Sequence, residues 1–112
     1  MANKYHARKC TYDGYLFDSQ AECNRYRELR LLERAGEIAA LEVHPRYVIF
    51  EGHDPEGKRQ KIEYEGDFQY RDAADLLVCE DVKSKVTRTA VYLLKRKMFV
   101  CKYPNIRHVE VM

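Results

Sequence analysis

The chain has 112 residues, of which 46% are hydrophobic and 34% charged, and its formal net charge is only +2. This length accommodates a single domain over residues 1–112, because domains typically run to about 100–150 residues, and this composition excludes a disordered chain. No apolar run approaches the ~20 residues of a membrane span, and the N-terminus lacks the apolar stretch of a secretory signal. We therefore expect an intracellular, cytoplasmic protein without a membrane anchor.

The four cysteines lie far apart in the sequence, at Cys10, Cys23, Cys79 and Cys101, without a C-x-x-C pair. Structural zinc sites usually have paired ligands at short spacing, so this pattern argues against zinc. In an intracellular chain we expect these cysteines to be reduced thiols, several of them buried.

The first third of the chain predicts a hairpin followed by a helix. An Asp-Gly dipeptide, a strong tight-turn signal, indicates a hairpin over residues 8–17. Ser19 and Glu22 have the spacing of a capping box, which predicts a helix that begins after Ser19. Gly36 is well placed to end that helix.

The rest of the chain predicts strands and one more helix. The expected strands cover residues 46–50, 61–71, 76–83 and 107–111, with turns at 53–57 and 72–75 and a helix at 89–102. The order of these elements predicts a mixed α/β (α+β) fold, in which a mixed central β-sheet is flanked by two main helices.

Charged residues recur in the strands expected near the centre of this sheet. Because side chains alternate along a strand, Asp81 and Lys83 point to one face, roughly 6–7 Å apart, while Glu80 points to the other. Asp67 lies on the preceding strand, across a predicted hairpin. Such charges in an apolar strand require either a solvent-filled cleft or a bound ion.

This grouping suits the hydrolysis of phosphodiester bonds. Two carboxylates favour Mg²⁺, a hard cation that prefers oxygen ligands and keeps several waters. Such a cation polarises a phosphate and lowers the pKa of a bound water. A neighbouring lysine can orient that water or stabilise the charge that develops on the phosphate.

Several motifs of the chain are similar to those of known families. Asp67, followed fourteen residues later by Asp81-Val82-Lys83, resembles the D…(D/E)xK signature of the PD-(D/E)xK nuclease superfamily, which includes Holliday junction resolvases and many restriction-like endonucleases. A wider set of motifs resembles a family of small phage-encoded proteins of domain type DUF1064. These motifs are Tyr12-Asp13-Gly14, Phe17-Asp18-Ser19 with Glu22, Leu29 to Gly36-Glu37-Ile38, Asp67-Phe68-x-Tyr70, Glu80 to Lys83, and Tyr92-x-x-Lys95-Arg96-Lys97.

The resemblance implies a restriction-endonuclease-like core and a metal-dependent DNA endonuclease, for which branched DNA is one candidate substrate. It implies that Asp67, Asp81 and Glu22 bind the metal, with Mg²⁺ as the cofactor and Mn²⁺ as a substitute. Lys83 would position the water or stabilise charge. Asp81 departs from the commoner pattern, because many members of the superfamily have Glu there.

Some candidate roles have two interpretations that the sequence leaves open. Glu22 is either a metal ligand of this kind or the glutamate of the capping box, and the two roles are compatible. Lys95 lies in the apolar stripe of the second helix and is either a phosphate contact or a lysine whose stem covers the core. Lys4, Arg8 and Lys9 form a basic N-terminal cluster that either binds DNA or is simply solvated.

Two further classes of function compete with the nuclease. One is a nucleic-acid-binding module that keeps the fold but does not cleave, against which the presence of both carboxylates and the lysine argues. The other is a structural metal protein that uses the cysteines, which their spacing disfavours. By analogy with junction resolvases we expect a homodimer. The histidines, His108 among them, show no ligand spacing and receive no role.

Overall fold

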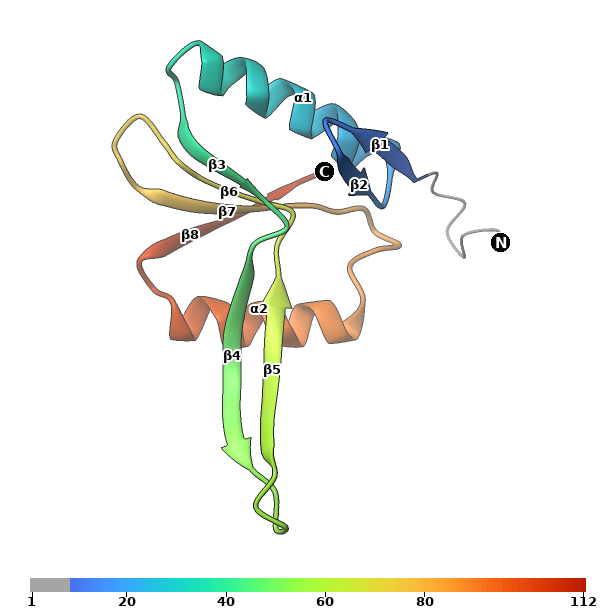
Figure 1. Cartoon of the computed structure of the whole chain (residues 1–112), viewed down its shortest axis with the longest axis vertical. Helices are drawn as coiled ribbons and strands as arrows, with labels where there is room; N and C mark the ends of the chain where they lie inside the picture. Colours follow the sequence, from blue (N-terminus) through green and yellow to red (C-terminus); the bar gives the residue numbers. More distant parts are fainter. Residues whose placement is uncertain (1–8) are drawn as a thin grey trace.

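A computed structural model describes residues 9–112. Helices α1 and α2 lie on opposite sides of a four-stranded sheet, and a two-stranded arm extends away from it (Figure 1). This mixed α+β architecture confirms the predicted fold class. The elements in chain order are β1 (Cys10–Tyr12), β2 (Tyr15–Phe17), α1 (Gln20–Arg34), β3 (Ala39–Val43), β4 (Arg46–His53), β5 (Arg59–Glu65), β6 (Phe68–Arg71), β7 (Leu77–Val82), α2 (Ala90–Lys102) and β8 (Ile106–Val111).

The four-stranded sheet has the order β3-β6-β7-β8. β6 is antiparallel to both β3 and β7, whereas β7 and β8 are parallel. Parallel neighbours need a crossover connection, and α2 provides it between β7 and β8. β7 is therefore an inner strand with both faces covered, and it carries the carboxylates that the sequence analysis singled out.

Local signals in the sequence mark the ends of the helices as predicted. The Ser19 hydroxyl accepts a hydrogen bond from the backbone N–H of Glu22 at 3.2 Å, which caps the start of α1. Gly36 follows the helix with a φ of 79°, a left-handed conformation that glycine adopts without strain. At the start of α2, the Thr89 hydroxyl accepts from the N–H of Tyr92 at 3.1 Å.

The single strand predicted over residues 61–71 is wrong, because the chain changes sheets within it. β5 belongs to the arm with β4, β6 belongs to the central sheet, and Gly66-Asp67 joins them. A Cβ on Gly66 would lie 2.6 Å from the Cys79 sulfur, so only glycine allows the chain to pass this close to β7. Asp67 therefore lies at the junction of the two sheets rather than within a strand.

Strand β3 was not predicted, and its backbone explains why. Its pairing with β6 shifts register between Ala39 and Glu42, and Ala40 has a φ of 57°. This irregularity breaks the alternation of apolar and polar residues by which a strand is recognised in sequence.

Two apolar clusters lie on opposite faces of the sheet. Because neighbouring residues of β7 point in opposite directions, Val78 belongs to the α1 cluster and Cys79 to the α2 cluster. The buried members of the first are Phe17, Cys23, Tyr26, Leu29, Phe68, Tyr70 and Val78, and those of the second are Tyr47, Ile49, Tyr64, Cys79 and Phe99.

The prediction of four reduced thiols is wrong for two of the cysteines. Cys10 of β1 and Cys23 of α1 form a disulfide, with their Cα atoms 6.2 Å apart, whereas Cys79 and Cys101 are free. Folding the hairpin against α1 brings the pair together, and the spacing along the chain does not reveal this. The disulfide joins the β1–β2 hairpin to the first turns of the helix.

A buried ion pair connects α1 to the centre of the sheet. Glu80 is 1% exposed, and its two oxygens accept from Nε and Nη2 of Arg25, both at 2.8 Å. The Tyr70 hydroxyl donates to the same carboxylate. This fork-shaped pairing compensates the charge of Glu80 on the α1 side of the sheet.

Replacing Arg25 tests that compensation. Arg25→Met leaves the buried Glu80 carboxylate without its counter-charge, so we expect the free energy of unfolding to fall by roughly 3 kcal/mol, measured by urea denaturation. The control is Glu28→Gln, because Glu28 is the exposed second partner of Arg25 at 3.0 Å. We expect the control to lose less than about 0.5 kcal/mol; equal losses in both variants would contradict the structural role given to Glu80.

Candidate functional site

Adjacent carboxylates of β7 point to opposite faces of the sheet. Glu80 faces α1 and is engaged by Arg25, whereas Asp81 lies on the α2 side among Tyr64 and His108. Both side chains are only 1% exposed. Since Glu80 has its full set of partners, its role is structural, and the chemistry of the site rests on Asp81.

One oxygen of Asp81 is held by two side chains. Oδ2 accepts from the Tyr64 hydroxyl and lies 2.7 Å from Nε2 of His108. Burial and then the charge of Asp81 raise the pKa of Tyr64, so this hydroxyl stays protonated and donates. Nε of Arg96, always a donor, lies 3.3 Å from Nδ1 of His108. His108 is therefore assigned the tautomer with its proton on Nε2, which donates to Asp81.

The other oxygen of Asp81 has no partner. Oδ1 is buried and receives no hydrogen bond from any of residues 9–112. A buried carboxylate oxygen without a donor is unfavourable, and native structures rarely leave one without a reason. This oxygen therefore remains able to accept a hydrogen bond or to coordinate a cation.

Asp67 lies next to this position, where the chain passes from the arm to the sheet. Its backbone N–H donates to the carbonyl of Glu80 at 3.0 Å, and its Oδ2 accepts from the N–H of Val82 at 2.7 Å. Burial raises the pKa of Asp67 to about 9, and hydrogen bonding with Glu22 and the charges of Glu22 and Asp81 add to the effect. Glu22 and Asp81 are therefore close enough to influence the Asp67 carboxyl group.

The structure tests one of the two roles that the sequence left open for Glu22. Its Oε2 accepts from the backbone N–H of Asp18 at 2.7 Å, so it satisfies a donor ahead of the helix. Its side chain is also buried against Asp67. The capping role is confirmed, although the donor is Asp18 rather than Ser19, and a role as metal ligand stays a prediction.

The predicted basic residues are spread over the molecule. The Lys83 ammonium lies 4.6 Å from the centre of the Tyr92 ring, on the α2 side of the sheet that Asp81 also faces. Lys95 is half-buried on α2, and Lys9 is exposed before β1. Lys4 and Arg8 lie outside the described residues, so their predicted DNA contacts stay predictions.

The chemistry of these groups fits a hard divalent cation. The carboxyl groups of Glu22, Asp67 and Asp81 are buried and supply only oxygen donors. Mg²⁺ and Mn²⁺ prefer donors of this kind. As the side chains stand, however, no three His, Cys, Asp or Glu residues in the described part of the chain are gathered closely enough to hold a metal ion. Glu22, Asp67 and Asp81 thus supply the donors but not a closed coordination shell.

Sequence reasoning missed Tyr64, Arg96 and His108. His108 received no role because its partner Asp81 is 27 residues away in the chain, and the parallel pairing of β7 and β8 brings the two together. A signal existed in the alternation of β8, which directs His108 to the same face as Asp81 once the two strands are aligned. The parallel alignment itself has no local signature.

The raised pKa of Asp67 predicts a pH dependence of stability in EDTA. The unfolded chain releases this proton near a pKa of about 4, whereas the folded protein keeps it up to about 9. The contribution of Asp67 to the free energy of unfolding is therefore greatest below pH 4 and falls as pH rises towards 9. Asp67→Asn removes this loss, so we expect it to be more stable than the parent at pH 8 by on the order of 2 kcal/mol, but not at pH 4.

Urea unfolding at both pH values measures this difference. Asp75→Asn is the control, because the Asp75 side chain is 86% exposed and undergoes the same chemical change. Parallel pH profiles for the parent and Asp67→Asn would show that Asp67 is ionised throughout.

Comparisons with known proteins identify a family but no characterised relative. No helix within residues 9–112 is long and apolar enough to cross a membrane. Neither the curated proteins nor the solved structures contain a match to this chain. One family model, described as "Protein of unknown function (DUF1064)", matches residues 2–112. Because this match covers nearly the whole sequence, the chain belongs to the DUF1064 family.

Proposed function

We propose that this protein is a metal-dependent endonuclease that hydrolyses phosphodiester bonds of DNA. The observation that carries the proposal is the buried Oδ1 of Asp81, which has no partner among residues 9–112, together with the neighbouring carboxyl groups of Glu22 and Asp67. A purely structural carboxylate would have hydrogen-bond partners for both oxygens. Glu80, the adjacent residue, points to the opposite face and has such partners. The arrangement also supports membership of the PD-(D/E)xK superfamily, which forms part of the proposal.

The residues of the chain divide the work between them. Glu22, Asp67 and Asp81 would hold Mg²⁺ or Mn²⁺, which when bound neutralises phosphate charge and lowers the pKa of a water. Asp67, whose pKa is raised by burial, would bind the cation in its deprotonated form. Lys83, on the same side of the sheet as Asp81, would orient the attacking water or stabilise the charge on the phosphate.

His108 and Tyr64 act through Asp81. By donating to Oδ2, they fix the carboxylate plane and leave Oδ1 as the oxygen available to the cation. Partners of this kind orient a ligand and tune its basicity. Arg96 in turn keeps the His108 proton on the nitrogen that faces Asp81.

Asp81→Asn tests the site by cleavage and by metal binding. Labelled four-way junction, flap, duplex and single-stranded DNA are incubated with Mg²⁺, Mn²⁺ or EDTA. We expect metal-dependent cutting by the parent and a loss of at least about 100-fold in Asp81→Asn, because a neutral amide cannot replace the ligating charge. We also expect about 10 mM Mg²⁺ to raise the melting temperature of the parent but not that of the variant, because a cation that binds only the folded state stabilises it.

The exposed Asp75→Asn serves as the control and should cut and respond to Mg²⁺ like the parent. Cleavage by Asp81→Asn at the parent rate would refute the site assignment. Absence of cutting and of any Mg²⁺ response in the parent would favour the alternative, a nucleic-acid-binding module that has the fold without the activity.

Lys83→Ala separates catalysis from binding. If Lys83 acts on the water or on developing charge, the variant should cleave about 100-fold more slowly while its affinity for DNA changes less than about threefold. Lys85→Ala is the matched control, since Lys85 is an exposed lysine two residues further along. Equal losses of rate and affinity in Lys83→Ala would instead make Lys83 a simple phosphate contact.

The proposal extends to assembly and location. A four-way junction offers two equivalent strands, which a two-fold symmetric homodimer matches. The outer face of α2 provides a candidate surface, because Val91 and Leu94 are more than half exposed there. We place the protein in the cytoplasm of a bacterial host cell, as for a phage or prophage product, where Cys10 and Cys23 would meet reducing conditions.

A further inference from the structure

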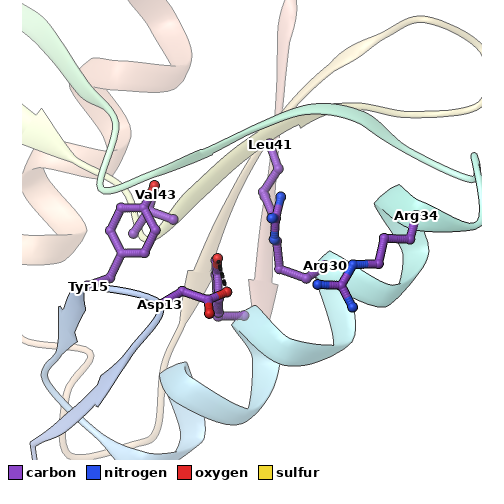
Figure 2. A pocket seen from close by; sticks show the side chains of 7 residues that line it. Asp13, Tyr15, Arg30, Arg34, Leu41 and Val43 are labelled. Carbon is purple, nitrogen blue, oxygen red and sulfur yellow. Dashed lines mark hydrogen bonds between the residues drawn. The ribbon is translucent and has the colours of Figure 1, made fainter.

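A concave region lies beside α1, and none of Glu22, Asp67 and Asp81 lines it. It is a cavity of about 360 Å³, open to solvent on one side and bordered by the β1–β2 hairpin, α1 and β3. Its walls include Asp13 and Tyr15 from the hairpin and Arg30 and Arg34 from the helix (Figure 2). This volume lies within the range of sites that hold small ligands, about 300–1,000 Å³. A smaller cavity of about 140 Å³ shares Asp13, Arg30 and Arg34 with it.

Arginines line the helix side of the cavity. Arg27, Arg30 and Arg34 are three and four residues apart, so they follow one face of α1. Arg30 is held in place because its Nη1 binds Glu33 at 2.5 Å and Glu33 accepts from the Leu41 N–H of β3 at 3.0 Å. Its Nε is nevertheless buried and has no partner among residues 9–112. The guanidinium groups of Arg30 and Arg34 line the cavity, and two such cations suit an anionic ligand such as a phosphate.

Aromatic rings line the hairpin side. Tyr15 is 41% exposed, and its ring lies 5.6 Å from that of Tyr26, which also borders the cavity. Tyr12 is exposed as well and carries the Arg27 guanidinium 5.2 Å from its ring centre. Exposed rings beside arginines provide the stacking platforms and cations that bind unpaired nucleotides.

Asp13 supplies an acceptor between the rings and the arginines. The Tyr26 hydroxyl donates to Asp13 Oδ2 at 2.9 Å, which fixes the carboxylate in the cavity. A carboxylate repels a phosphate but accepts from the exocyclic amino group of a base. Figure 2 shows Asp13 and Tyr15 on the hairpin side and Arg34 further along the helix, so base and phosphate contacts would be separated.

We propose that this cavity binds one unpaired nucleotide of a DNA strand, its base against Tyr15 and its phosphate against Arg30 and Arg34. A paired base lies inside the duplex stack and cannot enter such a cavity, so the ligand is single-stranded DNA next to a duplex. Because the proposal concerns the substrate, it rests on the proposed nuclease function. It predicts that the protein prefers tailed or branched DNA to plain duplex DNA.

The position along α1 connects the cavity to the carboxylates. Arg30 follows Glu22 by two turns of the same helix, a distance of about 12 Å at 1.5 Å per residue. Tyr26 lies between them, one turn from each. A strand that crosses the carboxylates could therefore reach the cavity within a few nucleotides.

Binding in EDTA tests the cavity without requiring cleavage. Fluorescence anisotropy compares a labelled duplex carrying a single-stranded tail with a blunt duplex that has the same number of phosphates. We expect the parent to bind the tailed DNA about tenfold more tightly, the effect of roughly one stacked base. Tyr15→Ala and Arg34→Gln should each lose most of this preference. Both residues are exposed, and thermal unfolding verifies that the variants fold.

The control is Lys97→Gln, an exposed cation on α2, on the opposite side of the sheet. Loss of a general phosphate contact weakens both DNAs equally, so the control should keep the ratio of affinities. A parent without preference, variants that keep the preference, or tighter binding of a tail made of RNA would each overturn the proposal.

Asp81→Asn distinguishes failure of this proposal from failure of the nuclease. It should lose cleavage and keep the preference for tailed DNA, because Asp81 does not line the cavity. Cleavage without any tail preference in the parent would refute the cavity alone, whereas tail preference without cleavage would refute the nuclease alone.

Discussion

The structure depends on the burial of two adjacent carboxylates, Glu80 and Asp81, on the inner strand β7. Removing a charge from water is costly unless it is paired and hydrogen-bonded, so each side chain needs partners on its own face of the sheet. The two faces meet this requirement differently. Glu80 receives a complete set from Arg25 and Tyr70, whereas Asp81 receives partners for one oxygen only.

These partners come from elements that the carboxylates thereby hold in place. Arg25 belongs to α1, Tyr64 to the arm and His108 to β8. A two-stranded arm is marginally stable alone, and here its base is held by Tyr64 at Asp81 and by the Tyr47 hydroxyl at Gln69, 2.6 Å away. The arrangement of the fold around β7 is therefore largely the arrangement needed to satisfy its charges.

The sequence predicted the features that have local causes. The caps at Ser19 and Gly36 and the turn at Asp13-Gly14 follow from short-range geometry, and alternation along β7 placed Glu80 and Asp81 on opposite faces. The nuclease role of the carboxylates remains a prediction.

Features set by contacts between distant segments were missed. The change of sheet at Gly66 depends on a sulfur 13 residues away at Cys79, and the pairing of His108 with Asp81 depends on parallel register between β7 and β8. Neither contact can be predicted from the residues next to it in the sequence. The elements that carry the candidate site were thus easier to predict than the partners that orient it.

Helix α1 carries residues of both the carboxylate cluster and the cavity. Its first turn carries Glu22, and Arg30 lines the cavity two turns later. Strands of three residues do not form a stable hairpin alone, but the Tyr26–Asp13 hydrogen bond and the packing of Phe17 against Tyr26 attach this hairpin to the same helix. The Cys10–Cys23 disulfide adds a covalent link wherever conditions are not reducing. Glu22 and the helical wall of the cavity therefore belong to one continuous element. Under the two proposals, a nucleotide in the cavity would therefore lie at a distance from Glu22 that is fixed by two turns of one helix.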